Sequence, residues 1–283
     1  MTVRIVTDSS CDLSAADIER HQITVVPLTI RFGDEEFTDG VGLSAENFYE
    51  KMAASGELPS TAAPAPGAFE AVFRELAAGG ADAVVCVNLS FALSATGESA
   101  QAAARATEGE VDVRVVDSGK VSVGLGVMVK AAAAAAAAGH RADEIEAQLA
   151  QLKERVFIYA VLDTLDNLKK GGRIGTAQAL LGSALSIKPC LDLTSGVVEE
   201  AGKQRTRGKA RNWLAAQVAE AGELEHLAIA HGAADDIDAF VASLGESPAQ
   251  NSLTVALIGP VVGTHAGPGV IAAAMVPAAA VGV

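Results

Sequence analysis

Residues 83–97 read Ala-Val-Val-Cys-Val-Asn-Leu-Ser-Phe-Ala-Leu-Ser-Ala-Thr-Gly, and this stretch holds the pattern that decides the fold. Its first five residues are apolar and predict a buried strand. A loop rich in hydroxyl side chains follows over residues 88–97, and an alanine-rich helix is then expected as far as Arg105. A short apolar strand that passes through a polar loop into a helix is typical of a parallel sheet covered by helices.

The same order of strand, polar loop and helix recurs along the first half of the chain. Further strands are expected over residues 3–6, 25–30 and 111–116, further helices over residues 14–21, 68–79 and 124–139, and Pro-rich or Gly-rich loops over residues 60–67 and 263–269. Ligands of such sheets collect at the carboxyl ends of the strands. Because Ser9, Ser90 and Thr96 follow predicted strands, we expect their side chains to lie near a ligand.

A second α/β region is expected after a charged helix over residues 142–155. At 283 residues the chain is long enough for two domains, since domains mostly run to about 100–200 residues. The pattern changes near residue 154, where an apolar strand over residues 157–161 opens a new mixture of strands and helices. We therefore expect an N-terminal α/β domain over residues 1–153 and a C-terminal α/β domain over residues 154–283.

The net charge of −14 comes from 21 basic and 35 acidic residues. An acidic balance of this size argues against nucleic acid or an anionic membrane surface as a partner of the whole chain. Cys11, Cys86 and Cys190 are far apart and form no CxxC motif or zinc-binding spacing. A reducing cytoplasm is the compartment that fits best.

The N-terminus enters a strand-like run directly and does not have the pattern of a signal peptide. Two apolar stretches approach the length of a membrane span. Residues 121–138 contain Lys130 and a block of alanines, and residues 247–283 are interrupted by Pro260, Pro268, Pro277 and many glycines. A bilayer span needs about 20 continuous apolar helical residues, so we expect no stable membrane insertion.

No familiar catalytic or nucleotide motif occurs in the sequence. It contains no GxSxG, GxxxxGK[ST] or HExxH, and no complete GxGxxG after a strand. We therefore expect neither a metal site nor a cofactor.

The sequence instead offers neutral hydrogen-bond donors in loops: Thr61, Ser94, Thr96 and His265. Hydroxyls and an imidazole together form a good receiver for a carboxylate or phosphate. Two other interpretations remain open: Thr61 and Ser94 cap the helices that follow them, and His265 is incidental in a Gly-Pro turn.

Several motifs resemble those of one known family, in the expected order and from end to end of the chain. They are Thr7-Asp8-Ser9-Ser10-Cys11-Asp12-Leu13, Ser60-Thr61-Ala62-Ala63-Pro64 with Pro66-Gly67-Ala68-Phe69, Leu93-Ser94-Ala95-Thr96, Leu165-Asp166-Asn167-Leu168, Gly171-Gly172-Arg173-Ile174, Ile187-Lys188-Pro189, Arg205-Thr206-Arg207 with Lys209-Ala210, and His265 with Gly267-Pro268-Gly269. This set is similar to the motifs of the DegV family, which includes the fatty-acid-binding (FakB-type) subunits of bacterial fatty acid kinase.

The resemblance implies a two-domain α/β fold, with a mostly parallel N-terminal sheet flanked by helices and a mixed sheet in the second domain. It implies a long-chain fatty acid, such as palmitate, stearate or oleate, in a buried tunnel with its carboxyl held between the domains. It also implies that a separate FakA-type kinase subunit converts the bound acid to acyl phosphate from ATP, so that this chain is a carrier and not an enzyme.

Carried over by position, Thr61, Ser94 and His265 resemble the residues that hold the carboxylate. Arg173 resembles an arginine near the carboxyl or the surface that faces the kinase, and Arg205 and Arg207 resemble a basic strand for kinase docking. We also place Gly267 in the ligand loop. Ala95, where the family usually has glycine, and Ala62-Ala63, where it commonly has glutamine or methionine, depart from its pattern at the tunnel mouth.

Two other functions compete with the carrier. A serine hydrolase or thioesterase would use Ser94 as the nucleophile and His265 as the base. An interaction or regulatory module would bind no ligand. Labelling by a serine-reactive phosphonate would favour the first, and empty pockets after purification would favour the second.

Overall fold

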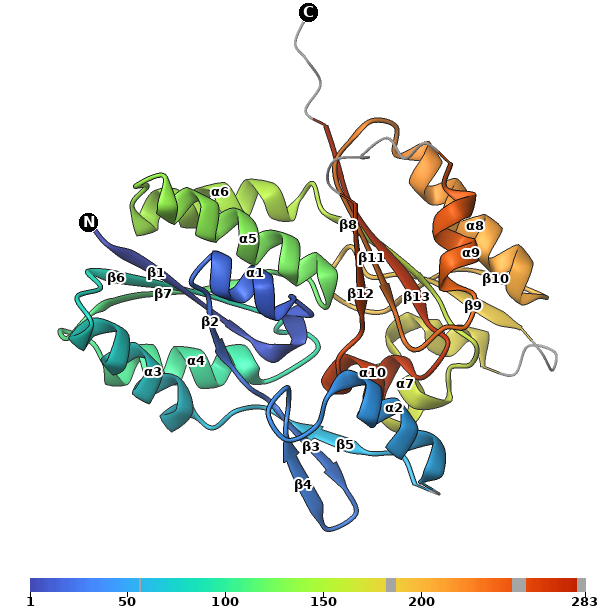
Figure 1. Cartoon of the computed structure of the whole chain (residues 1–283), viewed down its shortest axis with the longest axis horizontal. Helices are drawn as coiled ribbons and strands as arrows, with labels where there is room; N and C mark the ends of the chain where they lie inside the picture. Colours follow the sequence, from blue (N-terminus) through green and yellow to red (C-terminus); the bar gives the residue numbers. More distant parts are fainter. Residues whose placement is uncertain (56, 182–186, 246–252, 279–283) are drawn as a thin grey trace, which may run out of the picture.

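The computed structural model describes residues 1–55, 57–181, 187–245 and 253–278. In the N-terminal half a four-stranded parallel sheet has the order β2-β1-β6-β7, as Figure 1 shows. Its strands are β1 (Val3–Asp8), β2 (Thr24–Val26), β6 (Ala83–Asn88) and β7 (Asp112–Asp117). The parallel sheet predicted from the repeated pattern is therefore confirmed.

Helices cover both faces of this sheet, because successive side chains of a strand point to opposite sides. Val6 and Val84 pack with Phe69 of α3 (Pro66–Ala78) and Ala100 of α4 (Thr96–Ala106). On the other face, Ile5 and its neighbours share a core with α5 and α6. These two helices are α5 (Val123–Ala137) and α6 (Ala142–Lys153), and α1 (Ala15–Arg20) is capped by Ser14.

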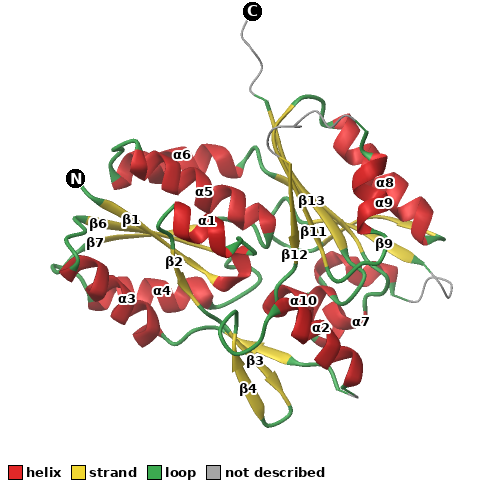
Figure 2. Ribbon diagram, viewed as in Figure 1, coloured by secondary structure: helices red, strands yellow, loops and turns green. Residues whose placement is uncertain are grey.

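The second sheet is mixed and has the order β10-β9-β8-β13-β11-β12. Its strands are β8 (Phe157–Val161), β9 (Lys188–Asp192), β10 (Glu199–Gln204), β11 (Leu224–His231), β12 (Leu253–Leu257) and β13 (Ile271–Pro277). Only β11 and β12 pair in parallel among the described strands of this sheet. The helices α8 (Arg207–Glu220) and α9 (Ile237–Ser243) cover one face, as Figure 2 shows.

Helix α5 lies between the two sheets and contacts β1 and β6 on one side and β11 and β13 on the other. This position explains its glycines and alanines. A Cβ atom at Gly124 would lie 2.3 Å from Cδ1 of Ile158, and one at Gly126 would lie 2.7 Å from the carbonyl oxygen of Cys11. The first part of the predicted apolar run, residues 123–133, is thus mostly buried between the sheets, whereas Ala134, Ala137 and Ala138 are exposed.

A third sheet has the order β4-β3-β5 and projects below the other two in Figure 1. It contains β3 (Thr29–Phe32), β4 (Glu35–Thr38) and β5 (Ser60–Ala62), and α2 (Ala45–Ala54) follows β4. The prediction of one strand over residues 25–30 was wrong. The chain forms two strands there, because it leaves the parallel sheet after Val26 and enters the small sheet at Thr29.

Two predicted loops also contain regular structure. The first residues of the Pro-rich loop form β5, in which Thr61 pairs with Ile30 of β3. The Gly-rich stretch before residue 267 belongs to the short helix α10 (Pro260–Ala266). Pro260 stands at its first position, where the fixed φ angle of proline suits a helix and no N–H is needed. Gly267, with φ of 79°, ends it.

The remaining elements are the 3₁₀ helices η1 (Ser9–Cys11) and η2 (Gly175–Leu180) and the helix α7 (Asp166–Lys170). Within the described ranges, no helix has the length and apolar character to cross a membrane.

Candidate functional site

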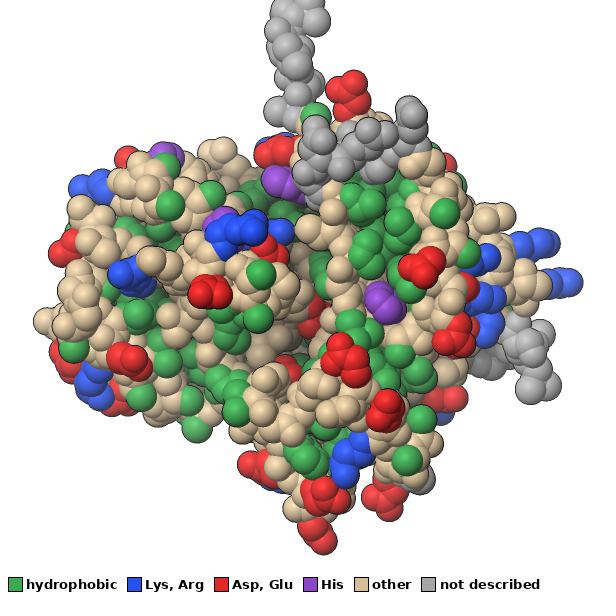
Figure 3. Space-filling view, in the orientation of Figure 1, with side chains coloured by type: hydrophobic (Ala, Val, Ile, Leu, Met, Phe, Trp, Pro, Cys, Tyr) green, Lys and Arg blue, Asp and Glu red, His purple; other side chains and the backbone are tan. Residues whose placement is uncertain are grey.

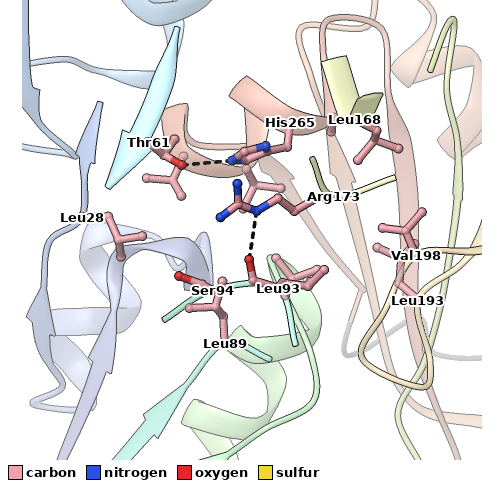
Figure 4. Close-up of a pocket in the computed structure, with 14 residues that line it drawn as sticks. Leu28, Thr61, Leu89, Leu93, Ser94, Leu168, Arg173, Leu193, Val198 and His265 are labelled. Carbon is pink, nitrogen blue, oxygen red and sulfur yellow. Dashed lines mark hydrogen bonds between the residues drawn. The ribbon is translucent and has the colours of Figure 1, made fainter. Parts of the chain in front are cut away.

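The hydroxyl of Thr61 and the ring of His265 meet at a hydrogen bond of 3.0 Å between Oγ1 and Nε2. Strand β5 supplies Thr61 and the last turn of α10 supplies His265, as Figure 4 shows. The pairing of β5 with β3 fixes Thr61 in the register of the small sheet. The sequence-predicted donors Thr61 and His265 are therefore in direct contact.

The His265 ring is largely enclosed, and its Nδ1 atom is buried without a hydrogen-bond partner in the structure. Burial, and secondarily the positive charge of Arg173, lower the pKa of His265 to about 4. The imidazole is consequently neutral at physiological pH. Gly171 lies directly against the ring, since a Cβ atom there would be 2.3 Å from Nδ1.

Asn167 holds the helix that carries His265. Its Nδ2 atom donates a hydrogen bond of 3.0 Å to the carbonyl oxygen of Thr264, and its side chain is buried. Gly267 passes close to the same amide, because a Cβ atom at Gly267 would lie 3.1 Å from Cγ of Asn167. Helix α7 thus positions the end of α10 through Asn167 and Gly171.

Ser94 approaches the site from the loop after β6. Its Oγ atom lies 2.9 Å from Oγ1 of Thr96 and accepts a 3.3 Å hydrogen bond from the Thr96 backbone N–H. Thr96 is fully buried at the start of α4. Ala95, not Ser94, is the N-cap residue of α4, and no side chain caps this helix, so the capping interpretation of Ser94 is wrong. The Ser94 side chain lines the cavity described below.

Arg173 bridges the loops of the two halves. Its Nε atom donates to the carbonyl oxygen of Leu93 at 3.1 Å, and one terminal nitrogen donates to the carbonyl oxygen of Gly171 at 2.7 Å. In Figure 4 its guanidinium lies between His265 above and Ser94 below. A positive charge is thus held beside the neutral donors.

The side chains of Thr61, Ser94, Arg173 and His265 line a cavity of about 90 Å³. In Figure 4 they lie together on the side away from Leu193 and Val198, and we call this side the polar end. The rest of its wall is apolar and comes from both halves of the chain: Leu28, Leu89, Leu93, Val121, Leu168, Leu193, Val198, Val261, Val262 and Ala266. The cavity therefore has a polar end with hydroxyl, imidazole and guanidinium groups and a hydrocarbon interior. This arrangement suits an elongated apolar molecule that carries one anionic headgroup.

Ser9, Ser90, Thr96 and Gly267 do not line this cavity. Ser9 Oγ accepts a hydrogen bond from the backbone N–H of Leu28 at 3.0 Å, and Ser90 Oγ donates to the carbonyl oxygen of Gly196 at 2.5 Å. Their positions at strand ends led to the expectation of ligand contact. The structure gives Ser9 and Ser90 hydrogen bonds to the backbone of neighbouring segments instead.

The basic segment over residues 205–207 has one exposed arginine and one paired arginine. Arg207 binds Asp236 through two nitrogens at 2.9 and 3.0 Å, and its third nitrogen lies 3.6 Å from Oδ1 of Asp163. Arg205 is exposed. Figure 3 shows Lys and Arg side chains gathered on the side of the molecule where β10 and α8 lie.

The geometry does not favour a hydrolase. Ser94 is hydrogen-bonded to Thr96, and Nε2 of His265 is hydrogen-bonded to Thr61, so the structure has no hydrogen bond between the serine and the histidine. Among the residues that the structure describes, no acidic group orients Nδ1 and none hydrogen-bonds it. A base with a pKa of about 4 is also poorly matched to proton transfer near neutral pH.

Sequence reasoning assigned no role to Asn167 or Gly171, although both stand in motifs singled out by the resemblance. Their importance arises from the contact between α7 and α10, which are almost a hundred residues apart. The apolar lining also escaped prediction residue by residue, because leucines and valines at a cavity have the same pattern as those in any core.

Comparison with known proteins shows the family of this chain. The model of the DegV family, described as an uncharacterised protein family, matches residues 2–278. The chain belongs to the DegV family. A DegV domain-containing protein of Streptomyces coelicolor is 39% identical over 273 residues, which cover 95% of this chain and 96% of that protein.

Solved structures of other DegV proteins have the same fold. A DegV family protein from Thermus thermophilus, described as fatty acid binding, has a TM-score of 0.88 at 33% identity and covers 98% of this chain and 100% of its own. DegV of Bacillus subtilis, described as a fatty acid binding protein, has a TM-score of 0.86 at 29% identity, with coverages of 98% and 100%. A stearic acid-binding protein from Eubacterium ventriosum has a TM-score of 0.87 at 26% identity, with coverages of 97% and 98%.

Proposed function

We propose that this DegV protein binds a long-chain fatty acid, such as palmitate, stearate or oleate, and is a carrier without catalytic activity of its own. Thr61, Ser94 and His265 hold the carboxylate, at the junction of domains 1–153 and 154–283. The observation that carries this proposal is the hydrogen bond between Thr61 and His265 at the polar end of an otherwise apolar cavity. The solved DegV structures described as fatty acid binding support the same ligand class.

The neutral His265 determines how Thr61 meets the carboxylate. We infer that Nε2 carries the ring proton and that the unpartnered Nδ1 atom carries the lone pair, because buried N–H groups without a partner are rare. Nε2 then donates to the Thr61 oxygen, and the hydroxyl proton of Thr61 is left to donate to the ligand. Ser94 supplies a second hydroxyl, and the nearby Arg173 adds a favourable charge.

The hydrocarbon tail supplies most of the binding energy. About fifteen methylene and methyl carbons at ~0.8 kcal/mol each give roughly 12 kcal/mol of gross transfer energy. Association costs of about 4–15 kcal/mol offset much of this. Ligand clefts commonly enclose about 300–1,000 Å³, so the cavity of about 90 Å³ must widen when a tail enters.

We further propose that the bound carboxylate is presented to a separate FakA-type kinase subunit in the cytoplasm for conversion to acyl phosphate. Arg173 stands at the polar end of the cavity, and Arg205 is exposed on the basic segment. These two residues are suited to contact an acidic or phosphate-bearing partner. Arg207 would join them only by giving up its ion pairs with Asp236 and Asp163.

The decisive experiment is denaturing mass spectrometry of the natively purified protein, in which we expect a fatty acid of fourteen to eighteen carbons. The double variant Thr61→Val/Ser94→Ala should lose this acid and remain folded. A folded wild-type protein that neither retains nor takes up fatty acid would refute the carrier. For the kinase step, Arg205→Ala should slow acyl phosphate formation by the added kinase subunit, whereas the control Arg114→Ala, on β7 and paired with Asp112, should not.

A further inference from the structure

The turn between β9 and β10, residues 193–198, forms one wall of the cavity. Leu193 and Val198 stand at its two ends, and both line the cavity. In Figure 4 they lie together on the side away from Thr61 and Leu28. A ligand whose headgroup is at Thr61 therefore meets this turn with the far part of its chain.

The turn is tied to the other half of the molecule by two hydrogen bonds of 2.5 Å. Ser90 Oγ donates to the carbonyl oxygen of Gly196, and Nζ of Lys120 donates to the carbonyl oxygen of Thr194. Ser90 and Lys120 follow the adjacent strands β6 and β7 and are themselves joined, since the Ser90 N–H donates to the Lys120 carbonyl at 2.8 Å. The strand-end loops of the parallel sheet thus hold the turn of the mixed sheet in place.

The fit at Gly196 is close. Its φ angle is 89°, and a Cβ atom there would lie 3.0 Å from both the Gly119 carbonyl oxygen and Ser90 Oγ. On its own side the turn is anchored by the backbone N–H of Leu193, which donates to the Ile158 carbonyl at 2.9 Å. The position of Leu193 and Val198 is therefore fixed from both halves.

Lys120 is unusual because a lysine that is only 2% exposed is rarely retained in a protein interior. Burial lowers the pKa of its amine to about 8, and Lys153 adds to this effect while Glu154, Asp192 and Asp117 oppose it. The role of Lys120 lies in the turn that it supports. Its amine donates to the carbonyl oxygen of Thr194, which accepts no other hydrogen bond among the contacts described for this segment.

We propose that the turn over residues 193–198, held by Ser90 and Lys120, is the tail-end wall of the cavity and determines which acyl chain length the protein accepts. This inference rests on the proposed fatty-acid binding. It gives Ser90 a role in specificity through the turn, without contact between its side chain and the ligand. Leu193 and Val198 are the residues that meet the end of the acyl chain.

The test measures the dissociation constants of saturated fatty acids from lauric to arachidic acid. We expect Leu193→Ala and Val198→Ala to shift the preferred acid to longer chains, with a gain of roughly fourfold for each additional methylene that becomes buried. Leu28→Ala, which enlarges the same cavity at the opposite end, should weaken all lengths alike.

Loss of the hydrogen bonds that hold residues 193–198 should weaken the dependence of affinity on acyl chain length. Ser90→Ala and Lys120→Met are expected to reduce the difference in affinity between the best and worst acids at least fivefold, whereas the exposed control Lys209→Met should leave it unchanged. Melting temperatures identify any variant that fails to fold, and the two alanine variants at residues 193 and 198 then decide the question.

If the folded Leu193→Ala and Val198→Ala variants show the wild-type dependence of affinity on chain length, residues 193–198 do not set the accepted chain length, although fatty-acid binding itself stands. Absence of binding of every acid by the wild-type protein would overturn the proposed function and the wall together. The two failures are thus distinguishable in one set of measurements.

Discussion

Thr61 and His265 are 204 residues apart in sequence, and their side chains lie 3.0 Å apart in the structure. This pair joins the small sheet of the N-terminal half to the short helix α10 near the C-terminus. The arrangement makes the polar end of the cavity depend on the complete fold. Neither half of the chain alone contains the pair.

Thr61→Val removes the hydroxyl and preserves the shape of the side chain. We expect fatty-acid affinity to fall by roughly 5–150-fold, because a buried partner left without its hydrogen bond costs about 1–3 kcal/mol. Isothermal titration with palmitate measures the effect. Thr254→Val on the exposed strand β12 is the matched control, and equal affinities of the two variants would place the carboxylate elsewhere.

The pKa of about 4 predicts that His265 does not titrate near neutrality. In the unfolded chain its pKa is near 6.5. The unfolded state therefore binds more protons between about pH 4 and 6.5, and the contribution of His265 makes stability rise with pH across that window. The NMR signal of the His265 ring should stay constant from pH 5.5 to 8. A change of this NMR signal with a midpoint near pH 6.5 in the folded protein would contradict a neutral His265 that donates its ring proton to Thr61.

The parallel sheet and its helices are largely predictable from the sequence, whereas the mixed sheet was expected only from the family resemblance. Short apolar strands such as residues 83–88 are bounded by polar loops, and this local pattern determines a parallel sheet without any long-range information. The prediction that residues 121–138 are buried core is confirmed for residues 123–129 with Ala132 and Ala133, whereas Ala134, Ala137 and Ala138 of the alanine block are exposed. The packing of this helix between two sheets was not foreseeable, because small side chains indicate close approach without naming the partner.

The errors of prediction occur where a distant contact decides the local structure. Residues 60–62 lie before Pro64 and Pro66 and have the composition of a loop, yet they form a strand because β3 offers an unpaired edge. Residues 260–266 contain glycine and proline and still form a helix, which α7 supports through Asn167. Convergence of Thr61, Ser94, Arg173 and His265 on one cavity was expected from the family resemblance, not from spacing in the sequence.

Gly171→Ala should disrupt the site without breaking the backbone. The φ angle of Gly171 is −75°, which alanine adopts readily. The added Cβ would lie 2.3 Å from Nδ1 of His265, so the ring must move and its bond to Thr61 is strained or lost. We expect at least a tenfold loss of fatty-acid affinity, a factor of ten being about 1.4 kcal/mol.

The control for this substitution is Gly208→Ala in α8, where a new Cβ meets nothing within 4 Å. Alanine there should preserve affinity and slightly increase stability, because glycine costs roughly 0.5–1 kcal/mol relative to alanine inside a helix. Equal binding by the Gly171 and Gly208 variants would show that the position of the His265 ring is not set by α7.

Asp12 couples the two halves and should make stability depend on pH. Its carboxylate accepts hydrogen bonds from the Ser122 hydroxyl at 2.5 Å and from the Gly259 N–H at 2.9 Å. Burial raises its pKa from 3.8 to about 7, although both hydrogen bonds oppose this, and the charges of Asp39 and Asp8 add to the rise. The folded state therefore binds more protons between about pH 4 and 7, and the contribution of Asp12 makes stability fall as pH rises.

Asp12→Asn keeps an oxygen for the Gly259 N–H and an amide for the Ser122 hydroxyl, and it removes the titration. We expect the free energy of unfolding of wild type to fall by about 1–3 kcal/mol relative to this variant between pH 4 and 7, a range reduced for screening by water. Urea titrations of both proteins at several pH values measure the difference, in which the parallel effects of Asp8 and Asp39 largely cancel. Stability curves that remain parallel over this interval would show that Asp12 is already ionised in the folded protein at pH 4.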